Sequence, residues 1–113
     1  MRPEYLTKTL DDPLYKLYLP LAYNNGVSIE EDKFIQTRND LLRKFPGLSV
    51  TPPDAPITGY WQSDGIMYTD QNITIEILTP DDEDDFFSQY KQTLRKRFRQ
   101  EEIHIQKTAA EQL

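Results

Sequence analysis

Apolar and polar residues alternate in two segments of the chain, and this alternation is its clearest structural signal. The segments are LYKLYLPLAY at residues 14–23 and NITIEIL at residues 72–78. A period of two residues is typical of a strand that turns one face toward a core. We therefore expect two half-buried strands. Their inward positions are Leu17, Leu19, Leu21, Ile73, Ile75 and Ile77.

Two other segments have helical spacing. The first follows SIEE, in which Ser28 fits a helix N-cap and Glu31 completes a capping box. This helix should end before Pro46–Gly47. Its apolar stripe contains Phe34, Leu41, Leu42 and Phe45, with Ile35 beside it and Arg38 at its edge.

The second helix should begin in the acidic run after Pro80 and end near Gln100. Acidic residues fill its first turn and basic residues its last turns, which complements the helix dipole. Its buried stripe is expected to contain Phe87, Tyr90, Leu94 and Phe98, with Phe86 adjacent.

The stretch between the helices predicts a short edge strand at LSV, a proline-stiffened connector and a hairpin at GYWQSDGIMY. The Asp64–Gly65 pair suits a two-residue turn. A last strand is expected in EEIHIQK, with Ile103 and Ile105 inward and His104 outward.

These elements predict an α+β fold. The order, without the hairpin, is βαββαβ, which indicates a ferredoxin-like sandwich with an extra β-hairpin between the second and third core strands. The two alternating strands would be central, and both helices would cover one sheet face. We expect a flexible N-terminal arm at residues 1–13, a single domain at 14–107 and a C-terminal tail at 108–113.

Composition narrows the function classes. The chain has 113 residues, no cysteine and a net charge of −6. The absence of cysteine excludes disulfides and thiolate chemistry, and the negative charge disfavours nucleic-acid binding. No apolar run is long enough for a membrane span, so we expect a cytoplasmic protein without membrane association. We also expect no cofactor and no metal site, because the acidic run 81–85 lacks the pattern of a calcium loop.

Three polar residues are candidates for chemistry. His104 is the only histidine, and Tyr18 and Glu76 should share the open sheet face with it. Together they could act as base, acid and hydrogen-bond donor. We instead interpret them as part of a polar face available for association, since an open face carries polar residues in any case.

An aromatic group in the hairpin is the other candidate. Tyr60, Trp61 and Tyr68 could form a recognition surface, because Trp and Tyr are enriched in binding hot spots. We expect Trp61 to close one end of the core, with the recognition surface as the alternative.

The segments LYLPL, RKFPGLSV, GYWQSDGIMY, NITIEIL and RFRQEEIHI give the chain a family resemblance. It resembles a group of small, uncharacterised bacterial domains of unknown function. The resemblance spans residues 17–105 and implies a ferredoxin-like fold, but it implies no activity, cofactor or site residue.

From the sequence we predict an uncharacterised, non-catalytic bacterial protein that serves as a self-association or protein-interaction module. The partner would be a second copy, as a homo-oligomer, or another protein. The alternative is a small-molecule-binding protein or enzyme with a pocket between sheet and helices in a dimeric ferredoxin-like barrel.

Overall fold

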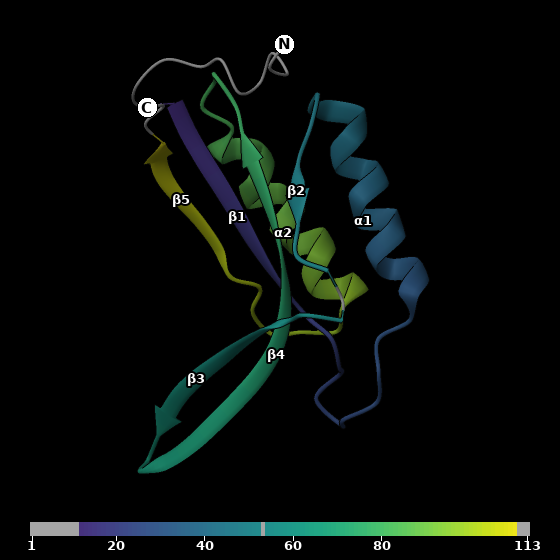
Figure 1. Cartoon of the computed structure of the whole chain (residues 1–113), viewed down its shortest axis with the longest axis vertical. Coiled ribbons are helices and arrows are strands. Elements are labelled where there is room, and N and C mark those ends of the chain that lie inside the picture. Colours follow the sequence, from purple (N-terminus) through teal and green to yellow (C-terminus); the bar gives the residue numbers. More distant parts are fainter. Residues whose placement is uncertain (1–11, 53, 111–113) are drawn as a thin grey trace.

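The structure is a computed structural model that describes residues 12–52 and 54–110. Figure 1 shows the helices and a twisted sheet from which a hairpin projects. The elements, in chain order, are β1 (Asp12–Pro20), α1 (Glu31–Lys44), β2 (Ser49–Val50), β3 (Ile57–Ser63), β4 (Ile66–Leu78), α2 (Asp84–Arg97) and β5 (Ile105–Ala110).

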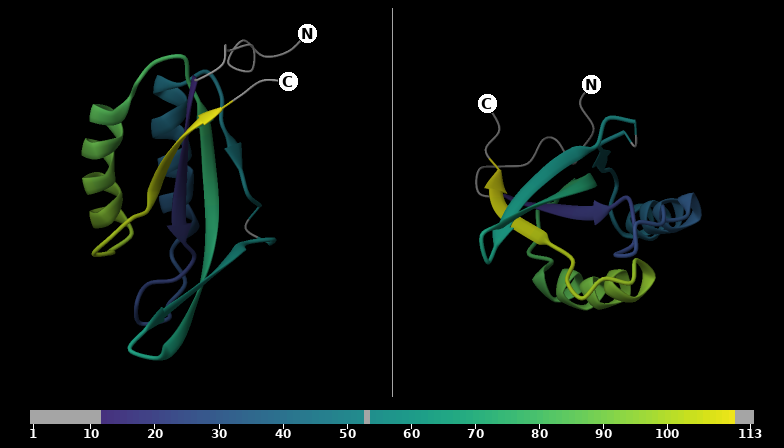
Figure 2. Two further views of the ribbon diagram at one scale, coloured as in Figure 1. Left: turned by 90° about the vertical axis from the view of Figure 1, so that its left-hand side faces the viewer. Right: turned by 90° about the horizontal axis from the view of Figure 1, so that it is seen from below.

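The five strands form one antiparallel sheet. Its order is β2-β4-β1-β5, and β3 pairs with the first half of β4. The two strands with alternating sequence are therefore central neighbours, as predicted, with Leu17 opposite Ile75. Both helices cover the same face of this sheet (Figure 2). The predicted α+β class is confirmed, and the strand order is compatible with a ferredoxin-like fold.

The core lies between this sheet face and the two helices. Leucines and isoleucines that point inward from β1 and β4 meet apolar residues of α1 and α2. The residues with almost no exposed surface are Leu17, Leu19, Leu41, Ile75, Ile77, Leu94, Phe98 and Ile103. Burial of a single large apolar side chain contributes about 1.5–3 kcal/mol, so these residues carry much of the stability of the fold.

Helix α1 differs from its prediction at its start and along its stripe. The N-cap is Glu30, without a side-chain capping bond, and Ser28 pairs with Ala22 in an isolated bridge. The predicted capping box is therefore wrong. Leu42 is exposed, whereas Thr37 is fully buried, because the Thr37 hydroxyl takes part in bonds between the two helices.

The hairpin is not separate from the core sheet. β4 continues from Ile66 to Leu78, so one strand serves as the second arm of the hairpin and as the predicted strand 72–78. Along one edge β4 pairs first with β3 and then with β2. The Asp64–Gly65 turn is confirmed, and both residues have positive φ, 53° and 79°.

The sheet extends past the expected domain boundaries at 14 and 107. Asp12 opens β1, and β5 continues to Ala110, opposite Asp12. Only residues 12–13 of the expected arm and 108–110 of the expected tail are described, and both lie in strands. The remainder of the arm and of the tail lies outside the described residues.

Candidate functional site

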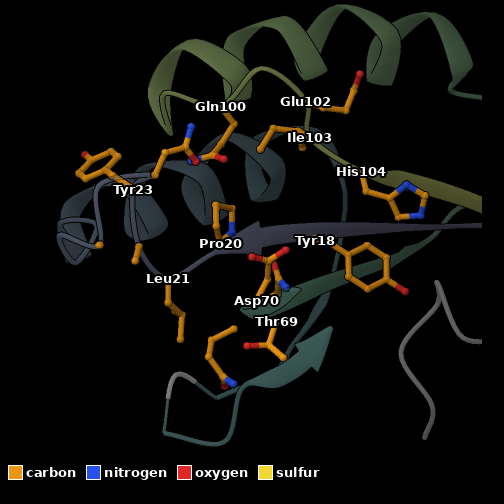
Figure 3. Close-up of a pocket in the computed structure, with 15 residues that line it drawn as sticks. Tyr18, Pro20, Leu21, Tyr23, Thr69, Asp70, Gln100, Glu102, Ile103 and His104 are labelled. Carbon is orange, nitrogen blue, oxygen red and sulfur yellow. The ribbon is translucent and has the colours of Figure 1, made fainter. Parts of the chain in front are cut away.

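A cleft of about 660 Å³ lies where β1 ends and the hairpin leaves the sheet. Three chain segments that are far apart in sequence form it: residues 18–26, residues 69–72 and residues 100–104. Figure 3 shows its labelled residues around a common hollow. Its polar and aromatic side chains are Tyr18, Tyr23, Asn24, Thr69, Asp70, Gln71, Asn72, Gln100, Glu102 and His104.

Two aromatic rings form one end of the cleft. The rings of Tyr18 and His104 have centroids 5.1 Å apart and are tilted by 42°. The backbone N–H of Tyr18 donates to the carbonyl of His104 at 3.0 Å, which fixes the two residues side by side. The Tyr18 hydroxyl donates to Oε1 of Gln106 at 3.3 Å. The Lys16 Nζ lies over the Tyr18 ring, 5.4 Å from its centroid, so a flat ligand could stack only on the parts of the two rings that line the cleft.

Tyr23 lies at the other end of the cleft (Figure 3). Its hydroxyl donates to Glu30 and accepts from Lys33. The hydrogen bond from Tyr23 lowers the pKa of the Glu30 carboxyl. The guanidinium of Arg99 lies over the Tyr23 ring at 5.1 Å. These contacts hold the Tyr23 ring in one position.

Two carboxylates line the cleft, and their environments differ. Glu102 pairs with Lys91 at 2.6 Å, and the hydrogen bond from Lys91 lowers the pKa of Glu102. Asp70 accepts a hydrogen bond from Nε1 of Trp61 at 2.9 Å and forms no ion pair within the described part of the chain. Asp70 is therefore the carboxylate that keeps an uncompensated negative charge beside the cleft.

Lysine and arginine do not occur among the described residues that line this cleft. A phosphate group usually requires such cations or a ring of backbone N–H groups. Aromatic faces together with a carboxylate instead favour a ligand that carries positive charge. Asp70, which has no ion pair among the described residues, and the lack of a lysine or arginine in the cleft lining thus favour a ligand with positive charge and without phosphate.

The structure brings only part of the predicted site residues together. Tyr18 and His104 meet in the cleft, as expected for a shared face. Glu76 lies on the same sheet face but pairs with Lys16 at 3.4 Å and does not line the cleft. The predicted set of histidine, glutamate and tyrosine is therefore divided.

The hairpin aromatics do not belong to the core. Trp61 is 48% exposed and stacks on Tyr68, with centroids 4.4 Å apart, so the expectation that Trp61 closes the core is wrong. A hairpin that projects beyond the helices has nothing to bury this ring against. Along the strands Trp61, Tyr68 and Asp70 share one face, and Tyr60 points to the other.

A second cleft, of about 560 Å³, lies between α1 and the sheet edge. The alternative prediction placed a pocket between sheet and helices in a dimeric barrel, and this cleft lies between the sheet and one helix of a single chain. Its walls are mainly apolar, with Phe34, Ile35 and Ile73 among them. Tyr18 and His104 do not line it, so the chemistry-bearing residues belong to the first cleft.

Sequence reasoning missed Asp70, Gln100 and Tyr23. Asp70 lies between the predicted hairpin, which ends at Tyr68, and the predicted strand 72–78, and Gln100 lies at the predicted end of a helix. Tyr23 and Gln100 lie next to turns, whereas Asp70 lies inside β4, where it pairs with Gly59. Their convergence depends on the length of β4, which the sequence pattern did not predict.

In residues 12–52 and 54–110, no three histidine, aspartate or glutamate side chains gather in a way that could hold a metal ion. Within the same ranges, neither helix has the length and apolar character needed to cross a membrane.

Comparison with known proteins gives structural neighbours only. No family model matches the chain, and no curated protein matches it. A phage SAM lyase in complex with S-methyl-5′-thioadenosine is similar in structure, with a TM-score of 0.59 and 16% identity over 88% of this chain and 81% of that one. The apo phage SAM lyase gives a TM-score of 0.57 and 16% identity over 87% and 80%.

These neighbours correct the predicted function. At 16% identity the likeness shows a shared fold. Both neighbours are structures of an enzyme, which contradicts the prediction of a non-catalytic interaction module. The alternative prediction, a small-molecule-binding protein or enzyme, agrees better with them and with the presence of a cleft that contains Tyr18 and His104.

Proposed function

We propose that the chain is a small enzyme that binds a sulfonium nucleoside of the S-adenosylmethionine (SAM) class and cleaves one of its carbon–sulfur bonds. The observation that carries this proposal is a cleft with aromatic walls and a carboxylate but without a lining lysine or arginine. The shared fold with a phage SAM lyase supports the same ligand class. The cleft volume of about 660 Å³ is in the usual range for such ligands.

The aromatic residues would bind the flat part of the ligand. Tyr18 and His104 present neighbouring rings at one end of the cleft, and a purine base stacks well on such rings. The side-chain amides of Asn24, Asn72 and Gln100 supply donors and acceptors along the walls, which suits the hydroxyls and ring nitrogens of a nucleoside.

Asp70 would bind the cationic part of the ligand. Its carboxylate lacks an ion-pair partner among the described residues, and the Trp61 indole N–H fixes its orientation. A ligand with a sulfonium or ammonium group would complete the charge balance that the chain leaves open. A neutral thioether would gain nothing from this carboxylate.

The proposed reaction removes positive charge from sulfur. The bond between sulfur and the amino-acid arm breaks as the carboxylate of that arm forms a new bond to the same carbon and closes a lactone. The electron pair of the broken bond goes to sulfur and leaves the neutral thioether S-methyl-5′-thioadenosine, so the lactone is the second product. The sulfur atom would thus lose the positive charge that Asp70 attracts. The neutral thioether product would then bind more weakly than the substrate, which favours its release.

The test is incubation of the purified chain with SAM, followed by chromatography for S-methyl-5′-thioadenosine. We expect the thioether to form faster than in protein-free buffer. We expect Asp70→Asn to bind SAM about tenfold more weakly and to bind the thioether unchanged. Asp64→Asn is the matched control, because it makes the same change in the hairpin turn, outside the cleft. Absence of binding and of product with the wild-type chain would overturn the proposal.

Three finer expectations remain part of this proposal. We read the sheet as a ferredoxin-like plan in which β3 and the start of β4 extend the hairpin between the second and third core strands. We retain the cytoplasmic location. A homo-oligomer also remains proposed, and the exposed aromatic hairpin supports it.

A further inference from the structure

The hairpin projects from the sheet without cover (Figure 1). Every residue from 60 to 71 is exposed, including Tyr60 at 71%, Ile66 and Met67. A two-stranded hairpin is marginally stable in water by itself, and contiguous exposed apolar residues mark interaction sites. The exposed hairpin therefore has the features of a surface that binds another chain.

The outer edge of β3 has free backbone groups. A two-residue turn makes Ser63 and Ile66 a hydrogen-bonded pair, and such pairs alternate along an antiparallel ribbon. The N–H and C=O groups of Thr58, Tyr60 and Gln62 then point away from β4. The same alternation makes Gln71 point outward from β4 on the other side, and the Gln71 carbonyl does accept from Leu21.

The outer sheet edges differ in how well they resist pairing. β2 has only two residues and is followed by Pro52, and β5 carries Lys107. Short strands, prolines and lysines are the devices that block edge-to-edge association. β3 has seven residues and contains no proline and no charged side chain. Among β2, β3 and β5, β3 is thus the edge strand that has none of these devices.

Gly59 adds an independent observation. Its φ is not positive, and a Cβ atom there would meet only Asn72 at 3.8 Å and the Asp70 carbonyl at 3.9 Å, which is ordinary contact. The fold of one chain therefore does not require glycine at this position. Glycine weakens a strand interior, so its presence in β3 requires another cause.

We propose that β3 pairs antiparallel with β3 of a second copy, about a two-fold axis at Tyr60. In this register Thr58 lies opposite Gln62 of the partner subunit, so all the outward backbone groups find partners. Gly59 lies opposite the partner's Trp61, whose ring covers the space that glycine leaves. The two strands are uncharged, so they can approach although each chain has a net charge of −6. The contact is isologous, as in most homodimers.

This inference is independent of the proposed reaction, and its test is the oligomeric state. Tyr60→Lys places two like charges opposite each other at the proposed axis. Met67→Lys adds the same charge to the other strand of the ribbon, where it does not face the β3 edge. Sedimentation velocity over a wide concentration range should show a wild-type dimer. Tyr60→Lys should raise the dimer dissociation constant about tenfold or more, and Met67→Lys should leave it nearly unchanged.

A second variant tests the register. Gly59→Thr favours the strand and fits the single chain, but it should weaken the dimer because it meets the partner's Trp61. Circular dichroism confirms that each variant is folded. A monomeric wild type would overturn the proposal. So would a dimer that Tyr60→Lys and Gly59→Thr do not weaken, or one that Met67→Lys dissociates equally well.

Discussion

Tyr18 and His104 lie with their ring centroids 5.1 Å apart, although 85 residues of chain separate them. A backbone hydrogen bond from Tyr18 to His104 joins them just before β5 begins. The pair forms one end of the cleft at the edge of the sheet. Their proximity follows from the antiparallel pairing of β1 with β5, and it brings the only histidine of the chain to a concave surface.

We predict that Tyr18→Leu and His104→Ala each weaken binding of S-methyl-5′-thioadenosine by about tenfold, because loss of a stacked ring costs about 1–3 kcal/mol. Isothermal titration calorimetry measures the effect. Both residues are outside the core, so thermal unfolding should change little. Tyr60→Leu, which removes an exposed tyrosine ring outside the cleft, is the control. Equal affinity in all variants would show that the rings do not bind the ligand.

A second prediction concerns the network between the helices. Arg97 donates to Oδ2 of Asp40 and to the Thr37 hydroxyl, both at 2.8 Å, and Tyr90 donates to Asp40 at 3.0 Å. Arg97→Met leaves the half-buried Asp40 carboxylate without its main cation. We expect unfolding free energy to fall by about 2–3 kcal/mol, measured by urea denaturation.

The matched control for this network is Arg95→Met, in the same helix. Arg95 contacts Gln92 and forms no ion pair among the described residues, so its replacement should cost less than about 1 kcal/mol. A similar loss of stability in both variants would mean that the Asp40–Arg97 pair contributes no more to stability than an unpaired arginine of the same helix.

A third prediction concerns alkaline pH. Burial raises the pKa of Tyr90 from an ordinary value of 10.0 to about 12, although the neighbouring Arg97 opposes this effect. The folded state therefore favours the protonated phenol. Its contribution to stability is fully present below pH 10 and is lost as pH rises from about 10 to about 12. In Tyr90→Phe this contribution to the pH dependence should be absent.

Urea denaturation of wild type and Tyr90→Phe at several pH values between 9 and 12 separates this effect from the titration of lysines, which both proteins share. The wild type should lose stability more steeply. If the unfolding free energies of the two proteins fell in parallel with pH, the pKa of Tyr90 would not be raised by folding.

The sequence allowed much of the fold to be predicted because burial and alternation coincide in β1 and β4. The apolar positions of these two strands are the buried ones, namely Leu17, Leu19, Ile75 and Ile77. The stripe of α2 was equally clear. Where a polar residue is buried through hydrogen bonds, as Thr37 is, hydrophobic patterning could not reveal it.

The site was only partly predictable. Tyr18 and His104 were recognised because strand alternation placed them on one face. Asp70 was not, since its role depends on a hydrogen bond from Trp61 across the hairpin. The position of Trp61 itself was mispredicted, because a large aromatic residue in a small domain usually packs in the core, whereas the long β4 carries this one past the helices.

The most direct test of the central claim is to map where the ligand binds. Amide chemical shifts of the isotopically labelled chain would be recorded while S-methyl-5′-thioadenosine is added. The account predicts that the largest shifts occur at Tyr18, Gln71, Asn72, Gln100 and His104, around the first cleft. Shifts concentrated at Ile29, Phe34 and Arg38, around the apolar cleft beside α1, or no shifts at all, would contradict it.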